Sequence, residues 1–181
     1  MSPLHSTWLM PTASDEAALQ SVVDALSLQF GTPRFQAHLT LTDGVHRSVA
    51  ELTGTLRMAA EGIHSFPAVI EDIETGDLYF RSFYARFAVS GPMAELHENA
   101  MALLAPGLEA ATAFMPHISL LYGADDTAEK QAVRRHWQKK LAGRPIRFDR
   151  ICIAAAGKGI AIGDWAIRST IPLGSREGAG K

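Results

Sequence analysis

The sequence predicts an α+β protein of two pseudo-symmetric lobes, each an antiparallel sheet with helices on its outer face, flanking a central cleft. The first observation is a repeat: residues 35–41 (FQAHLTL) and 114–120 (FMPHISL) share an aromatic, a histidine, an apolar residue, a hydroxyl and a leucine. The second is that helical and strand periodicities follow in a similar order around both copies. The third is that the two histidines lie almost half a chain length apart in 181 residues. Duplication of one α+β unit accounts for all three.

Composition limits the kinds of protein that this chain can be. With 181 residues and 47% apolar content, we expect one bilobal domain over residues 1–173 and a disordered, glycine-rich tail over 174–181. A net charge of −2 offers no broad basic surface for long nucleic acid. No apolar run reaches the roughly 20 residues of a membrane span, and no basic leader precedes one. We therefore expect a cytoplasmic protein, a monomer, with no membrane partner.

The elements of the first half follow from local signals. Residues 5–10 form a short strand that Pro11 ends. Ser14 is the expected N-cap of a helix with an acidic first turn, which Gly31 stops before the first motif strand. That strand ends at Asp43-Gly44, and Ser48 caps a second helix that runs to about residue 60.

The second half begins with β-branched and aromatic segments at 66–73 and 78–89, separated by Glu-Thr-Gly-Asp at 74–77, which is typical of a hairpin turn. Arg81, Tyr84 and Arg86 on the second segment either line a pocket or face water. Helices are expected from Gly91-Pro92, with His97 and Glu98 exposed, and from Thr127 to Leu141, the latter basic and solvated. Strands at 146–155 and 160–171 follow, joined by a Gly157-Lys158-Gly159 turn.

Alternation along a strand gives the repeat its chemical meaning. His38 and Thr40 share one face of the first motif strand, while His117 and Ser119 share one face of the second. Two imidazoles with pKa values near 6.5 can act as base and acid on opposite sides of a phosphorus atom. The two hydroxyls can donate hydrogen bonds to its non-bridging oxygens. No third ligand accompanies the histidines at metal-binding spacing, so we expect neither a metal nor another cofactor.

Other residues of these types are weaker candidates. His5-Ser6-Thr7 and His46-Arg47-Ser48 repeat the bare spacing, but Arg47 interrupts the apolar alternation and Ser48 is the predicted helix cap. His5 on the first strand remains a minor candidate. The lone cysteine, Cys152, lies in an apolar run and is expected to be a buried structural thiol.

The paired motifs resemble those of the 2H phosphoesterase (LigT-like) superfamily. HISLLYG at residues 117–123, together with Trp8 on a short first strand, is similar to the plant-type cyclic phosphodiesterase branch. The resemblance implies the bilobal fold and His38, Thr40, His117 and Ser119 as catalytic residues. It implies substrate contacts from Trp8, as a stacking surface, and from Tyr122, as a wall or donor; both residues also suit an aromatic core. Tyr122 reaches the pocket only if its strand ends before Gly123.

The resemblance implies metal-independent hydrolysis of a small cyclic phosphodiester. The substrate would be ADP-ribose 1″,2″-cyclic phosphate or a nucleoside 2′,3′-cyclic phosphate, opened to ADP-ribose 1″-phosphate or a nucleoside 2′-phosphate. One alternative is an RNA-end 2′–5′ phosphodiesterase or ligase, supported only by the basic helix, with nucleic acid binding limited to short ends. Another is a nucleotide-binding module without turnover. The residues alone do not say which histidine is the base.

Overall fold

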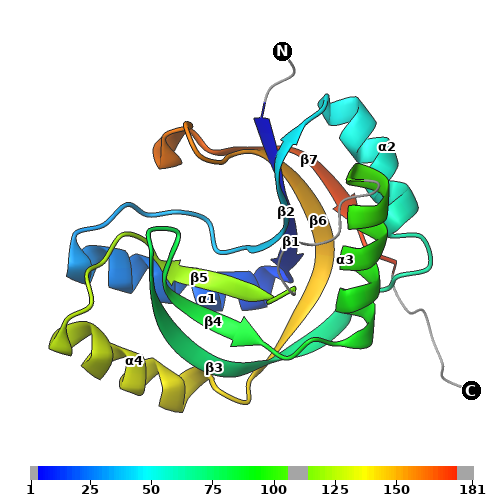
Figure 1. Cartoon of the computed structure of the whole chain (residues 1–181). Helices are drawn as coiled ribbons and strands as arrows, with labels where there is room; N and C mark the ends of the chain where they lie inside the picture. Colours follow the sequence, from blue (N-terminus) through cyan, green and yellow to red (C-terminus); the bar gives the residue numbers. More distant parts are fainter. Residues whose placement is uncertain (1–3, 106–113, 175–181) are drawn as a thin grey trace, which may run out of the picture.

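The computed structural model describes residues 4–105 and 114–174. The expected tail therefore lies outside the described residues, apart from Gly174. Along the chain, strands alternate with helices except over residues 66–87, where two strands follow each other directly (Figure 1). They are β1 (Leu4–Pro11), α1 (Ala13–Phe30), β2 (Leu39–His46), α2 (Val49–Ala59), β3 (Phe66–Leu78), β4 (Arg81–Phe87), α3 (Gly91–Leu104), β5 (His117–Leu121), α4 (Ala128–Leu141), β6 (Pro145–Ala155), the 3-10 helix η1 (Ile162–Asp164) and β7 (Ala166–Pro172).

The described strands form one antiparallel sheet in the order β1-β2-β5-β4-β3-β6-β7, which confirms the predicted α+β class. A further pairing between β1 and β6 closes six of these strands into a ring. The two lobes are therefore parts of one continuous sheet. The strands that carry the motifs, β2 and β5, are direct neighbours and pair at Leu39 and Ile118.

Helices cover the outside of the sheet in two pairs (Figure 1). On one side α2 and α3 pack together against β2, β6 and β7, and on the other α1 packs against β5 and α4 against β3. The apolar stripes of these helices and one face of the strands bury a common core. Helix α1 precedes the first motif in sequence but packs against β5, which carries the second motif, whereas α3 precedes the second motif and packs against β2.

Two predicted helix starts are confirmed by their caps. The Ser48 hydroxyl accepts from the backbone N–H of Glu51, whose carboxylate accepts from the backbone N–H of Ser48, which makes a capping box. The Thr127 hydroxyl accepts from the N–H of Lys130. In contrast, α1 begins at Ala13 with Thr12 as N-cap, two residues before the predicted cap.

The predicted hairpin turn at 74–77 is wrong. Strand β3 continues to Leu78, and Tyr79 and Phe80 form the tip before β4. Local turn propensity is overridden because Glu74 pairs across the strands with Tyr84 and bonds to its hydroxyl. The last strand also starts later than predicted, at Ala166, because η1 occupies Ile162–Asp164.

Two further side chains differ from expectation. His97 is half-buried rather than exposed, since its ring stacks on Phe114 at 3.8 Å and its Nδ1 bonds to the Leu41 carbonyl. Lys130 on the basic helix is buried, and its ammonium group donates to the Ala124 carbonyl. Within the described parts of the chain, no helix combines the length and apolar character needed to cross a membrane.

Candidate active site

A cavity of about 460 Å³ gathers the six residues that the sequence singled out. Trp8, His38, Thr40, His117, Ser119 and Tyr122 all line it. The remaining lining residues come from β1, β2, the β3–β4 hairpin and the β6–β7 connection: they are Ser6, Asp43, Leu78, Tyr79, Phe80, Arg81, Ala156, Gly157, Lys158 and Trp165. The two motifs therefore converge on one cavity.

The pairing of β2 with β5 explains this convergence. Leu39 and Ile118, the middle residues of the two motifs, lie opposite each other and are fully buried. In an antiparallel pair this register directs His38 toward Ser119 and Thr40 toward His117. Their four side chains therefore meet on the face opposite the core, which places each histidine beside the hydroxyl of the other motif.

The two imidazoles are held by equivalent hydrogen bonds. Nδ1 of His38 lies 2.7 Å from the Gln36 carbonyl oxygen, and Nδ1 of His117 lies 2.9 Å from that of Met115. A carbonyl oxygen can only accept, so Nδ1 carries the hydrogen and donates in both rings. Nε2 is therefore the atom of each histidine that can take or release a proton.

Burial makes both histidines reluctant to ionise. His38 is 6% exposed, and desolvation lowers its pKa from 6.5 to about 4, opposed by the Gln36 bond and reinforced by the charge of His117. Desolvation also lowers the pKa of His117, which is half-buried. Around His117, the charge of Arg81 acts in the same direction and that of Glu74 in the opposite one.

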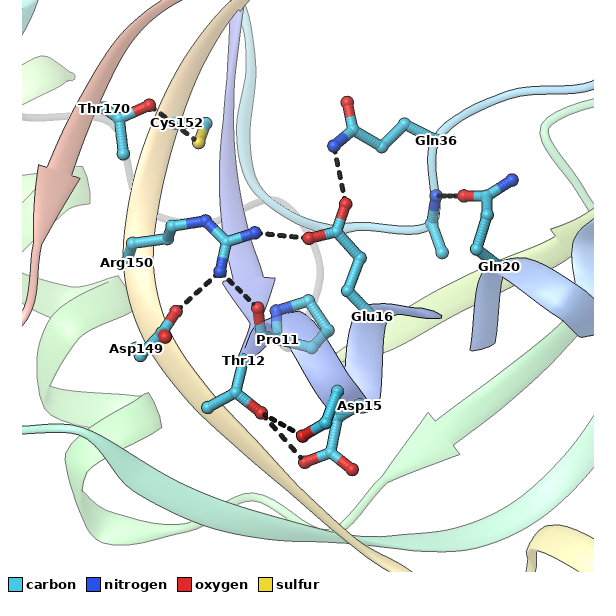
Figure 2. Close-up of polar contacts among 12 residues, drawn as sticks. Pro11, Thr12, Asp15, Glu16, Gln20, Gln36, Asp149, Arg150, Cys152 and Thr170 are labelled. Carbon is cyan, nitrogen blue, oxygen red and sulfur yellow. Dashed lines mark hydrogen bonds and ion pairs between the residues drawn. The ribbon is translucent and has the colours of Figure 1, made fainter. Parts of the chain in front are cut away.

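His38 precedes β2, so side chains rather than a sheet ladder hold the segment that leads to it (Figure 2). Gln20 on α1 accepts from the N–H of Ala37 at 2.8 Å. Glu16, one turn earlier, accepts from the Gln36 amide at 2.7 Å and pairs with Arg150 of β6. Arg150 in turn donates to the Pro11 carbonyl and to Asp149. The residue whose carbonyl orients His38 is thus fastened to both α1 and β6.

The two motif hydroxyls differ in their surroundings. Thr40 is exposed at the cavity. The Ser119 hydroxyl donates to the Phe80 carbonyl at 2.7 Å, at the tip of the β3–β4 hairpin, and it also contacts Tyr122. To donate to a phosphate oxygen, Ser119 has to rotate away from Phe80, whereas Thr40 does not.

Aromatic rings form much of the cavity wall. Trp8 is 2% exposed and stacks on the His38 ring with centroids 3.9 Å apart, so part of its surface supports the imidazole. Its indole N–H donates to Ser6. Tyr122 reaches the cavity because β5 ends at Leu121, which meets the condition set by the sequence, and its ring stacks on Phe35. Burial raises the pKa of its phenol.

The sequence pattern missed two features of the wall. The hairpin tip, Tyr79 and Phe80, lines the cavity because the turn comes later than predicted. Lys158 and Trp165 approach from the β6–β7 connection. The sequence signal for Lys158 was its position between Gly157 and Gly159, which we interpreted only as a turn between two strands. Of the three residues for which the sequence left open a pocket or a solvent-facing position, Arg81 lines this cavity.

The other candidates lie outside this cavity. His5 is buried, and its Nδ1 bonds to the Arg47 carbonyl, which assigns it a structural contact. Cys152 is buried behind Trp8 near Thr170, and desolvation raises the pKa of its thiol, as expected of a structural residue. Across residues 4–105 and 114–174, no three His, Cys, Asp or Glu side chains are grouped to hold a metal ion.

Two histidines at the start of adjacent antiparallel strands, within a bilobal α+β fold, form the arrangement that the resemblance to 2H phosphoesterases implies. The family model of the 2′-5′ RNA ligase superfamily matches residues 3–159, and the chain belongs to that superfamily. A curated relative, the cyclic phosphodiesterase of Arabidopsis thaliana, is 23% identical over 153 residues, which is 83% of each chain. These similarities support a phosphoesterase enzyme.

Solved structures agree with the fold. Escherichia coli LigT complexed with 3′-AMP gives a TM-score of 0.61 at 13% identity. The match covers 97% of this chain and 100% of the LigT chain. Its complex with phosphate gives a TM-score of 0.60, with 96% and 98% coverage. The protein TT0787 of Thermus thermophilus gives 0.54 at 17% identity, with 96% and 99% coverage. The predicted LigT-like architecture is thereby confirmed.

Proposed function

We propose that the protein hydrolyses small cyclic phosphodiesters without a metal, using His38 and His117 as a general acid–base pair. The observation that carries the proposal is the matched pair of Nδ1–carbonyl bonds, which leaves the Nε2 atom of each ring for proton transfer at one cavity. Hydrolysis needs a proton removed from water on one side of phosphorus and one delivered to the leaving oxygen on the other.

The substrates that we propose are ADP-ribose 1″,2″-cyclic phosphate and nucleoside 2′,3′-cyclic phosphates, opened to ADP-ribose 1″-phosphate and nucleoside 2′-phosphates. The name of the Arabidopsis relative supports this class. Arg81 and Lys158 at the cavity can attract the phosphate, and Thr40 can donate to its non-bridging oxygens. Trp8, Trp165 and Tyr122 provide apolar surface for a ribose or base.

The test is turnover of both substrates in the presence of EDTA, with phosphorus NMR of the product. His38→Ala and His117→Ala are each expected to lower kcat by at least a hundredfold, the usual size of a general acid–base contribution. His136→Ala, on the exposed side of α4, is the control and should retain wild-type rates. Turnover that survives in either cavity variant, or that vanishes with EDTA in the wild type, would contradict the mechanism.

A second candidate is an RNA-end 2′–5′ phosphodiesterase or ligase. A neighbouring cavity of about 660 Å³ shares Thr40, Asp43, Arg81 and His117 with the first and extends toward α3, so a second nucleotide has room beyond the histidines. The basic helix that first suggested RNA packs against β3 and lines neither cavity. Faster turnover of a 2′–5′ dinucleotide than of cyclic mononucleotides, with steep salt dependence, would favour this candidate.

The third possibility, a binding module without turnover, is the conclusion if no substrate of either kind reacts. Both histidines and both hydroxyls are present at the cavity, which argues against it. The cytoplasmic location, the monomeric state and the extent of the domain stay predictions.

A further inference from the structure

The pseudo-symmetry of the two motifs does not extend to what packs against each imidazole. The ring of His38 is enclosed by indoles: Trp8 stacks on it at 3.9 Å, and Trp165 meets it edge-on at 6.3 Å. The ring of His117 instead meets the phenol of Tyr84, at 5.3 Å and an interplanar angle of 68°. Of these three aromatic neighbours, Tyr84 is the one whose polar group bonds to a charged side chain, since the indole N–H groups of Trp8 and Trp165 donate to Ser6 and to the Ile160 carbonyl.

Tyr84 connects His117 to a cluster of charges on β3 and β4. Its hydroxyl donates to Glu74 at 2.6 Å, and the same carboxylate accepts from Nε of Arg86 at 2.6 Å. Glu71 pairs with the opposite end of the Arg86 guanidinium. The guanidinium of Arg81 lies 5.8 Å from the centroid of the Tyr84 ring. Tyr84 itself is 6% exposed, whereas the side chains of Glu74 and Arg86 are 30% and 31% exposed.

We propose that Glu74, acting through Tyr84, is a positioning residue that holds His117 as the proton donor of the reaction and so leaves His38 as the base. The inference rests on the proposed phosphodiesterase function and deepens it. His38 takes a proton from water as the water oxygen bonds to phosphorus. The bond from phosphorus to the leaving sugar oxygen breaks, and that oxygen takes its proton from His117.

The electrostatics agree with this division. Desolvation lowers the pKa of His38 to about 4, and no carboxylate opposes it, so His38 is neutral at the pH of the reaction. Desolvation is the main cause that lowers the pKa of His117, and the bond to the Met115 carbonyl opposes it; of the nearby charges, Arg81 lowers this pKa and Glu74 raises it. Because His117 is only half-buried and has a carboxylate acting in favour of its charged form, it keeps a proton more readily than His38.

Glu71 provides a matched control. Both carboxylates come from β3 and pair with Arg86, but only Glu74 bonds to Tyr84 and acts on His117. Glu74→Gln is expected to lower the pKa of His117, which NMR of the imidazole protons measures directly. Glu71→Gln should leave it unchanged, and Glu74→Asp, which keeps the charge, should retain most of the wild-type value. Thermal melts check that each variant is folded.

The pH profile of kcat/KM tests the assignment of donor and base. In Glu74→Gln the limb on the alkaline side should move to lower pH by the same amount as the pKa of His117 measured by NMR, without a rise at the optimum. If His117 were the base, lowering its pKa would populate the reactive form and raise the rate at the optimum, which would overturn the assignment. Equal NMR shifts in Glu74→Gln and Glu71→Gln would overturn the role of Glu74 itself. Absence of turnover in the wild type would overturn the proposed function and this inference together. If the wild type is active but Glu74→Gln leaves the pKa of His117 unchanged in the NMR titration, only the link from Glu74 to His117 is overturned.

Discussion

Gly123 offers a direct test of the hairpin tip as a wall of the active site. Its φ is +63°, and a Cβ built on it would lie 2.5 Å from Cε2 of Tyr79, while its N–H donates to the Tyr79 carbonyl at 2.8 Å. Ordinary contact begins near 3.4 Å, so in Gly123→Ala the Tyr79 ring has to retreat by about 0.9 Å. The ring is 50% exposed and can move into solvent without rebuilding the core.

Gly31 is the matched control, because its φ is +64° and nothing lies within 4 Å of an added Cβ. Alanine at either position costs about 1–2 kcal/mol for the left-handed backbone. We expect urea unfolding to show similar losses for both variants. Displacement of a wall by about 1 Å should lower kcat/KM for a cyclic nucleotide roughly ten- to a hundredfold in Gly123→Ala only.

Wild-type kcat/KM in Gly123→Ala, with a stability loss equal to that of Gly31→Ala, would refute the idea that Tyr79 shapes the cavity. A much larger loss of stability in Gly123→Ala would also refute the reasoning, because it would mean that the Tyr79 ring cannot move outward.

Three further outcomes are expected. A histidine in the unfolded chain binds a proton below pH 6.5, but His38 in the folded protein does so only near pH 4. The free energy of unfolding should therefore fall by roughly 1.4 kcal/mol per pH unit as the pH drops through this window. In urea unfolding, this fall should be shallower for His38→Gln than for His136→Gln. Lys158→Met should raise KM for ADP-ribose 1″,2″-cyclic phosphate about two- to fivefold, and less at high salt, because an exposed cation contributes little to binding. If Lys158 contacts the diphosphate of ADP-ribose, KM should rise less for a nucleoside 2′,3′-cyclic phosphate, which has no diphosphate; an equal rise would rule out this contact. Ser48→Ala should cost about 1 kcal/mol in chemical unfolding by loss of the capping box, and any change in its kcat/KM would show that α2 affects the site.

The face that carries the two histidines and two hydroxyls could be predicted because it depends on alternation within two short segments. Leu39 and Ile118 point into the core, so the flanking histidines and hydroxyls must point away from it. The same local reasoning predicted the end of β5 as the condition for Tyr122 to reach the cavity. These features need no knowledge of distant neighbours.

The rest of the site depends on contacts that no local pattern contains. The turn at 74–77 had the composition of a hairpin, but the bond between Glu74 and Tyr84 extends β3 and moves the tip to Tyr79. Trp165 reaches the cavity from a connection whose path is set by η1. The carbonyl partners of the imidazoles, in contrast, lie within the repeat, two residues before each histidine, but the residue types do not show the backbone conformation that brings each carbonyl to Nδ1.

The pairing of β1 with β6, which closes the ring of strands, affects how the chain folds while it is being synthesised. β1 ends at Pro11, but the strand that covers its second edge begins only at Pro145. While the ribosome makes the residues between them, that edge has no partner, and a strand with one open edge is prone to pair with other chains. Pairings this distant in sequence also slow folding. The Trp165 and Lys158 side of the cavity is translated later still, so the cavity of a nascent chain lacks one wall until these residues have left the ribosome.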